Sequence, residues 1–149
     1  CMGNICRSPA AEAVLRRWVQ ENGFEEEVEI DSAGTIRYHE GNPPDARMRS
    51  AGDARGLTID GFARQVRRQD LETFDRVIAL DRENLADLEE LAGGPRPHLR
   101  LLSSYLPAGS PADVPDPYWG GERGFEEVLN LLEEAVPALA EDLLSARRA

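Results

Sequence analysis

Four stretches of the chain carry the pattern of apolar and polar positions that is typical of helices. Gly23 is placed to end the first of these helices, and Asp81 to cap the start of the third. The second is rich in Arg and weakly apolar, so we expect it to lie on the surface. Pro137 lies inside the fourth and should kink that helix or divide it in two. The predicted helices are residues 9–22, 44–55, 82–92 and 122–146.

Shorter stretches have the patterns of β-strands. Residues 77–80 are an apolar run bounded by charged residues, which is typical of a central strand in a parallel sheet, and residues 98–102 form the next strand. Residues 28–31 alternate apolar and acidic side chains and predict a further short strand. Because strands and helices alternate, we expect one α/β domain over residues 1–149. It should have a small central parallel sheet, helices on both faces, and its ligand site at the carboxyl ends of the strands.

The composition of the chain argues against several classes of partner and cofactor. The formal net charge of −11 repels nucleic acid and anionic membranes, so we expect neither as a partner. Two Cys are too few for a disulfide framework, no apolar run has membrane-spanning length, and no signal peptide is evident, so we expect a cytoplasmic protein. His39 and His98 have no Cys or carboxylate neighbours at metal-ligand spacing, and we expect no metal or other cofactor.

The stretch CMGNICRSP has the chemistry of an anion-binding loop with a nucleophile at its base. Gly3 and Asn4 readily adopt positive φ, so successive backbone N–H groups can turn inward and form a nest for phosphate. Ser8 is a good N-cap for the helix that follows, whose positive end points back at the loop. The helix end, the inward N–H groups and the Arg7 guanidinium should all lower the pKa of the Cys1 thiol. We therefore expect Cys1 to be a nucleophile at neutral pH.

This loop resembles that of the low-molecular-weight protein tyrosine phosphatases, which carry Cys, five residues, Arg, then Ser or Thr. The resemblance extends over residues 1–146 and implies hydrolysis of protein phosphotyrosine through a phosphocysteine, with Cys1 as nucleophile and Arg7 gripping the phosphoryl oxygens. It also implies a tyrosine-phosphorylated protein as substrate and inorganic phosphate as product. We expect the enzyme to be a monomer, although the resemblance does not set the oligomeric state. The loop residues that it assigns to substrate binding are Met2, Gly3, Asn4, Ile5, Cys6 and Ser8.

A second matching segment, DPYWGG, lies in a long Pro- and Gly-rich connection. Its Asp116 matches the general acid of the family. The resemblance implies that Tyr118 and Trp119 wall the cleft, and Tyr38, in a variable loop at its mouth, would stack on a substrate ring. Because the acid must be protonated while the thiol is ionised, we expect a bell-shaped, mildly acidic pH optimum.

The resemblance also implies a network that holds the loop. Ser32 matches a Ser whose hydroxyl hydrogen-bonds the loop Asn, here Asn4, although a Ser that merely ends a strand explains this residue equally well. Residues 63–65, Ala-Arg-Gln, match a family segment. Gly61 stands where the family often has a supporting His, so we expect this network to be rewired or weaker.

One departure concerns the entry to the loop. In the family a buried parallel strand leads directly into the nucleophile, whereas nothing precedes Cys1 in this sequence. We expect that the native chain begins upstream, and that a sheet without this strand has a gap.

The sequence leaves alternatives at two places. Asp113 lies in the same connection as Asp116, and Asp81 is explained as a helix cap, so both compete only weakly for the role of acid. Cys6 could form a reversible disulfide with Cys1, as the family's second Cys does, or could be a small buried hydrophobic residue.

Three other functions are compatible with a loop of this kind. Arsenate reductases of the same fold need further Cys residues downstream, and none follows Cys6. Phosphoarginine phosphatases tend to have Thr where this chain has Ile5. An inert phosphoprotein-binding relative would lack the Cys, the Arg or the Asp, and this chain retains all three.

Overall fold

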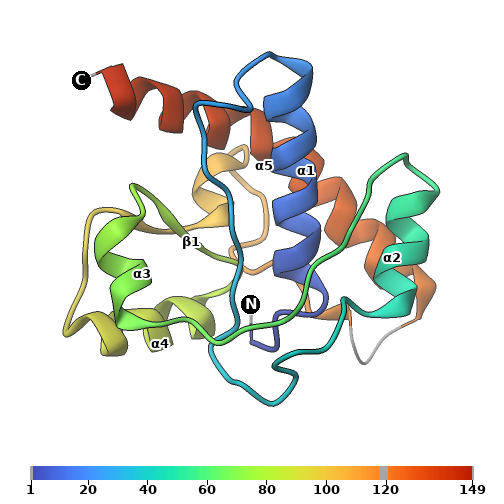
Figure 1. Cartoon of the computed structure of the whole chain (residues 1–149), viewed down its shortest axis with the longest axis horizontal. Helices are drawn as coiled ribbons and strands as arrows, with labels where there is room; N and C mark the ends of the chain where they lie inside the picture. Colours follow the sequence, from blue (N-terminus) through green and yellow to red (C-terminus); the bar gives the residue numbers. More distant parts are fainter. Residues whose placement is uncertain (1, 118–120, 149) are drawn as a thin grey trace.

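The computed structural model describes residues 2–117 and 121–148 (Figure 1). Its elements alternate along the chain as the sequence predicts, and two short helices, at residues 68–73 and 102–105, are not indicated by the sequence pattern. The helices are α1 (Arg7–Glu21), α2 (Ala46–Asp53), α3 (Arg68–Thr73), α4 (Arg82–Ala92), the 3₁₀ helix η1 (Leu102–Tyr105) and α5 (Glu122–Arg148); the strands are β1 (Val77–Ala79) and β2 (Leu99–Leu101).

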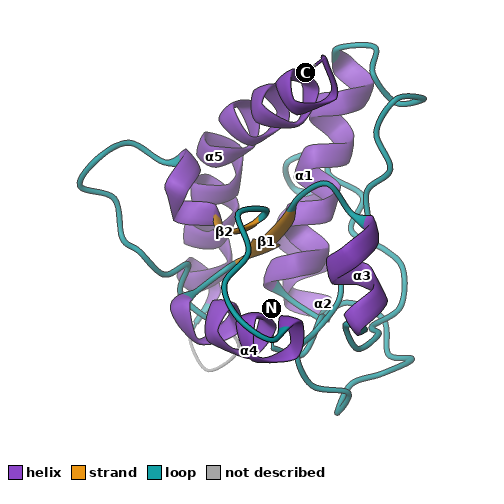
Figure 2. Ribbon diagram, turned by 90° about the vertical axis from the view of Figure 1, so that its left-hand side faces the viewer, coloured by secondary structure: helices purple, strands orange, loops and turns teal. Residues whose placement is uncertain are grey.

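The two strands form a parallel pair with helices packed on both faces, as predicted (Figure 2). Successive side chains of β1 enter two separate apolar clusters, because side chains alternate across a strand. Val77 and Ala79 pack with residues of α3 and α4. Ile78 and the following Leu80 pack with residues of α1 and α5. The second cluster also holds the largest fully buried side chains, among them Phe125, Met48, Leu102, Leu129 and Leu132.

Helix α1 begins earlier than predicted. It starts at Arg7 rather than Pro9, its N-cap position is Cys6, and no side chain caps it, so the prediction of Ser8 as N-cap is wrong. Ser8 is a buried residue of the first turn, and its hydroxyl accepts a hydrogen bond from the side chain of Asn4 instead. Pro9 fits the first turn because no N–H is required there. The helix consequently begins inside the loop, which brings its unpaired N–H groups to the site.

The end of α1 is as predicted. Gly23 has a φ of 78°, and its N–H donates to the carbonyl of Gln20 while the N–H of Phe24 donates to that of Val19. This pair of bonds is the Schellman motif, in which a left-handed glycine ends a helix.

Helix α5 is continuous through Pro137, so the proline does not divide it. Figure 2 shows that the helix bends along its length. Pro137 lies on the exposed side, where water can satisfy the carbonyl that loses its N–H partner. None of the helices described here has the length and hydropathy needed to cross a lipid bilayer.

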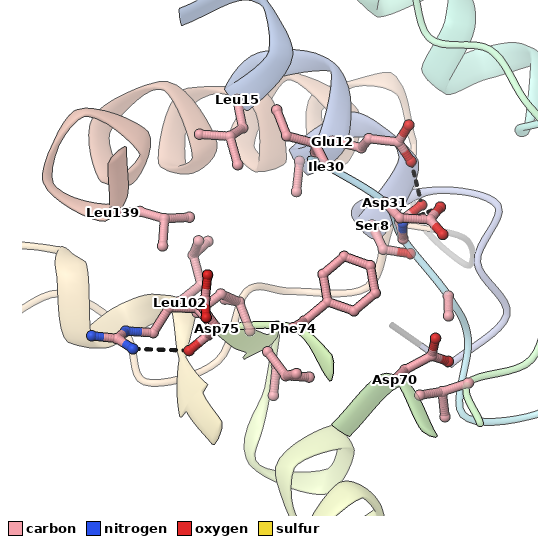
Figure 3. A pocket seen from close by; sticks show the side chains of 18 of the residues that line it. Ser8, Glu12, Leu15, Ile30, Asp31, Asp70, Phe74, Asp75, Leu102 and Leu139 are labelled. Carbon is pink, nitrogen blue, oxygen red and sulfur yellow. Dashed lines mark hydrogen bonds between the residues drawn. The ribbon is translucent and has the colours of Figure 1, made fainter. Parts of the chain in front are cut away.

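The strand predicted over residues 28–31 is not formed. This segment is extended but has no ladder, and a cavity of about 380 Å³ separates it from β1 (Figure 3). A strand requires a neighbour within hydrogen-bonding distance. Among the described residues, β1 pairs with β2 on one edge and borders the cavity on the other, so residues 28–31 have no strand beside them.

Candidate active site

The side-chain amide of Asn4 is the centre of the loop between Met2 and Arg7. Asn4 is buried and has a φ of 58°, the one positive φ of a non-glycine residue among those described. Its Nδ2 donates to the hydroxyls of Ser8 (2.8 Å) and Ser32 (3.0 Å), and its Oδ1 accepts from the backbone N–H of Arg64 (3.0 Å). The contact expected between Ser32 and Asn4 is therefore present. These bonds stabilise a backbone conformation that a residue with a Cβ rarely adopts.

The loop backbone is tied to the segment that follows residue 34. The N–H of Ile36 donates to the carbonyl of Met2 (3.0 Å), and the N–H of Asp45 donates to that of Ile5 (2.7 Å). Gly34 lies so close to the loop that a Cβ built on it would be 2.5 Å from the carbonyl oxygen of Met2. Nothing larger than glycine fits there without displacing the loop.

Arg7 is buried, and its guanidinium is anchored at one nitrogen. Nη1 donates to Oδ2 of Asp81 (2.7 Å) and to the carbonyl of Val114 (2.8 Å). Nη2 lies 4.0 Å from Oδ2 of Asp116. The structure thus brings together the loop Arg and the predicted acid from residues 109 positions apart. The contact of Arg7 with Asp81 was not predicted. The sequence feature that could have indicated it is the position of Asp81 directly after the strand pattern of residues 77–80, where a side chain lies at the carboxyl end of the strand.

The three candidate carboxylates have different surroundings. Asp81 caps α4, with Oδ1 accepting from the N–H of Asn84 (2.7 Å), while its other oxygen binds Arg7. Asp113 is paired with Arg82, whose hydrogen bonds hold the pKa of that carboxyl below its usual value. The Asp116 side chain is 36% exposed beside Arg7. Of the three, Asp116 is neither the cap of α4 nor the partner of Arg82.

Cys6 lies in the hydrophobic core and is a free thiol with 4% of its surface exposed. Burial, with the nearby charges of Asp45 and Asp116, raises the pKa of this thiol to about 12. Ile5, also assigned to substrate binding, belongs to the same core and is 9% exposed. The side chains of both residues are therefore part of the support beneath the loop, which leaves their backbone to face a ligand.

The turn-rich segment 35–44 lies beside the loop. Tyr38 is 82% exposed and makes an edge contact with His39, with ring centroids 4.8 Å apart. His39 in turn reaches the loop, since its Cδ2 is 2.9 Å from the position of a Cβ on Gly3. Met2 is 42% exposed on the same side. Three predicted site residues, Cys1, Tyr118 and Trp119, lie outside the described residues.

The described residues contain no group of three or more His, Cys, Asp or Glu side chains that could hold a metal ion. The charged groups near the loop are instead Arg7 and the carboxylates around it. Such an arrangement can bind a phosphate dianion and exchange a proton with it.

A parallel α/β domain with a loop of this geometry at the start of a helix places the chain among the cysteine-dependent phosphatases. The family described as low molecular weight phosphotyrosine protein phosphatase matches residues 1–149, and the chain belongs to this family.

Named relatives support this assignment. A low molecular weight protein-tyrosine-phosphatase of Streptomyces coelicolor is 46% identical over 143 residues, which is 93% of this chain and 87% of the relative. One of Bacillus subtilis is 44% identical over 135 residues, or 89% and 85% of the two chains. A crystal structure of a protein tyrosine phosphatase from Entamoeba histolytica superposes with a TM-score of 0.92 at 39% identity, covering 99% of this chain and 95% of that one.

Proposed function

We propose that this chain hydrolyses phosphotyrosine in proteins through a phosphocysteine intermediate and releases inorganic phosphate. The observation that carries the proposal is the juxtaposition of a buried, anchored Arg7 with Asp116 above a loop held open by Asn4. A guanidinium and inward N–H groups bind the phosphoryl oxygens, while a carboxyl at the mouth reaches the leaving group.

In the first step the Cys1 thiolate attacks phosphorus in line with the tyrosyl oxygen. The S–P bond forms as the P–O bond breaks, and Asp116 donates its proton to the departing phenolate. Arg7 and the loop N–H groups stabilise the charge on the equatorial oxygens. Because Nη1 of Arg7 is fixed by Asp81 and Val114, the guanidinium needs no reorganisation when the substrate arrives.

In the second step the Asp116 carboxylate accepts a proton from water. The water oxygen attacks phosphorus, the S–P bond breaks, and the thiolate and inorganic phosphate are regenerated. Asp116 ends protonated, as it began, so the cycle balances without any redox partner.

The substrate is proposed to be an aryl phosphate because of what lies at the mouth. Tyr38 and Met2 present exposed apolar surface beside the loop. Together with Tyr118 and Trp119 they would contact the flat ring of a phosphotyrosine side chain. We further propose that the enzyme acts as a monomer in the cytoplasm.

The test is a pH series of p-nitrophenyl phosphate and phosphotyrosyl-peptide hydrolysis without added metal. We expect a bell-shaped profile, and Cys1→Ser should lower kcat by about 10³-fold or more. Asp116→Asn should lower kcat about 10²-fold or more for the peptide. The loss should be smaller for p-nitrophenyl phosphate, because p-nitrophenolate leaves without protonation.

Turnover that survives Cys1→Ser would contradict the thiol mechanism. Equal losses on both substrates after Asp116→Asn would show that Asp116 does not protonate the leaving group. A chain that prefers phosphoarginine over phosphotyrosine in a matched peptide would overturn the substrate class while leaving the mechanism intact.

A further inference from the structure

We infer that the side chain of Arg64 is a positioning residue for the phosphate loop and acts through Asn4. The inference rests on the proposed function, because it concerns how that site is kept in its active shape. The hydrogen bonds of the Arg64 guanidinium go to Asp31, Gln65 and Asp70, which lie outside the loop. The backbone and the side chain of Arg64 hold the two segments that grip the Asn4 amide.

The two ends of the Asn4 amide are held by different parts of the chain. Nδ2 donates to Ser32, at the end of the extended segment 28–32, and Oδ1 accepts from the N–H of Arg64. The distance between Ser32 and Arg64 therefore sets the position and rotation of the amide. If the two segments move apart, Asn4 loses one end or the other.

Backbone pairing joins these segments only beyond the point where they hold Asn4. The N–H of Gly34 donates to the carbonyl of Arg64 and the N–H of Val66 to that of Gly34, both at 2.8 Å, as an isolated bridge. Before Gly34, the segment borders the cavity and forms no ladder with another described strand. Within the described residues, the segment before Gly34 is therefore held by side-chain contacts, among them Arg16 to the carbonyl of Ile30 (3.1 Å) and the Ser32 hydroxyl to Glu12 (2.8 Å).

The Arg64 guanidinium links the segment that carries Ser32 to the start of α3. Its Nε and Nη2 donate to Oδ2 of Asp31 (3.2 and 3.0 Å), the residue before Ser32. Its Nη1 and Nη2 donate to the two oxygens of Asp70 (2.9 and 3.2 Å) at the start of α3. Figure 3 shows Asp31 and Asp70 on opposite sides of the cavity. One planar cation therefore ties the segment carrying Ser32 to the helix beyond Arg64.

Asp70 is itself fixed, which makes it a firm anchor. Its Oδ2 also accepts from the backbone N–H of Arg67 (2.7 Å), as part of the cap of α3. The Arg64 side chain is 25% exposed and that of Asp70 16%, so water competes weakly for this pair. Asp31 is 47% exposed and is the weaker contact.

The consequence for the loop follows from the backbone of Asn4. A positive φ at a residue with a Cβ persists only where its surroundings impose it. Without the Arg64 side chain, Ser32 keeps its bond to Glu12 (2.8 Å), but Asp31 beside it is no longer tied to Asp70. The Asn4 amide is then held less firmly, and the loop N–H groups converge less well. Phosphate binding would then weaken, and the Cys1 thiolate would lose part of its stabilisation.

The experiment compares Arg64→Gln with Arg68→Gln in the full chain. Arg68 is the first residue of α3, four positions after Arg64, and its side chain and that of its partner Glu72 are each 70% exposed, with 3.9 Å between Nε and Oε1. This variant therefore removes one positive charge without touching the network. We expect Arg64→Gln to lower kcat/KM for p-nitrophenyl phosphate about tenfold to hundredfold and to weaken competitive inhibition by inorganic phosphate. Arg68→Gln should leave both unchanged.

Two readouts separate positioning from simple destabilisation. The pH dependence of Cys1 alkylation by iodoacetate, followed by mass spectrometry, should shift to higher pH in Arg64→Gln. In an Asn4→Ala background the same substitution should add no further shift, because its effect passes through Asn4. Arg64→Lys should recover little, since an ammonium cannot bridge two carboxylates with a planar fork.

A lower melting temperature with an unchanged alkylation profile and phosphate inhibition would overturn the inference. So would additive effects of Arg64→Gln and Asn4→Ala. If the wild-type chain proves inactive on every phosphoester, the proposed function fails. The alkylation profiles still decide the role of Arg64, because they require no turnover.

Discussion

At the scale of single residues, the absence of a side chain at Gly34 permits the loop geometry. A Cβ there would lie 2.5 Å from the Met2 carbonyl oxygen and 3.0 Å from the Asn4 nitrogen. Both neighbours are backbone atoms of the loop, so neither can rotate away as a flexible side chain would. The active-site loop and the segment after residue 32 are thus fitted to each other at backbone level.

We expect Gly34→Val to weaken phosphate binding and to lower kcat/KM by about tenfold or more, because the loop must shift to admit the side chain. Gly34→Ala should give a smaller loss in the same direction, since one methyl group demands a smaller shift. Phosphate affinity can be measured by calorimetry and turnover with p-nitrophenyl phosphate. Unchanged affinity in Gly34→Val would show that the loop tolerates displacement.

The sequence predicts part of this residue-level network. The contact of Ser32 with Asn4 could be expected from the resemblance. The weaker support expected at Gly61 stays a prediction. The contact of Asp81 with Arg7 could not be expected, because its position before a helix already accounts for Asp81 as an N-cap. A carboxylate has two oxygens, and in this structure each serves a different purpose. Sequence spacing cannot show that the second oxygen points at a residue 74 positions away.

At the scale of elements, the errors of prediction have a common physical origin. The alternation in residues 28–31 is real, but a strand requires a hydrogen-bonded neighbour, and among the described residues a cavity lies beside this segment. Helix α3 has six residues, too few for an apolar period to appear, and its cap depends on Asp70. Helix α1 could be predicted, because its 15 residues are enough to show an apolar period and because Gly23 marks its end.

Asp142 on α5 connects that helix to both strands. Its carboxylate accepts hydrogen bonds from Arg76 before β1 (2.8 Å), from Arg100 in β2 (3.1 Å) and from the Tyr105 hydroxyl (2.6 Å). These contacts, with that of Arg76 first, lower the pKa of Asp142 to about 2. Since the pKa of the folded state lies below that of the unfolded state, the carboxylate stabilises the fold above about pH 4. That contribution is lost as the pH falls from about 4 to 2.

We expect Asp142→Asn to lower the free energy of unfolding at pH 7 by about 1–3 kcal/mol, because three donors lose a charged acceptor. The difference from wild type should shrink as the pH falls through the range from 4 to 2. Urea unfolding at several pH values measures it. The matched control is Glu141→Gln on the exposed side of the same helix, which should change little. A difference that stays constant down to pH 2 would contradict the ion-pair account.

At the scale of the whole molecule, the architecture is the part that the sequence predicts best. An apolar run such as residues 77–80 must be covered on both faces, and the alternating helices supply that cover. The result is two apolar cores separated by the parallel strands β1 and β2. The candidate active site lies at the loop from which α1 begins. The meeting of Arg7 with Asp116 depends on this global arrangement, since the two residues belong to opposite ends of the chain.

The cavity beside β1 gives this strand two edges of different character, which should be visible in the rate at which its amides exchange with deuterium. Val77 donates to His98, and the alternation of a parallel ladder directs the N–H of Ala79 to β2 as well. The N–H of Ile78 points the other way, toward the cavity. We expect Ile78 to exchange much faster than its two neighbours in an NMR time course, because a buried strand is protected only where its amides are bonded. Equal protection of all three amides would mean that the Ile78 N–H has a hydrogen-bond partner on the cavity side of β1 in solution.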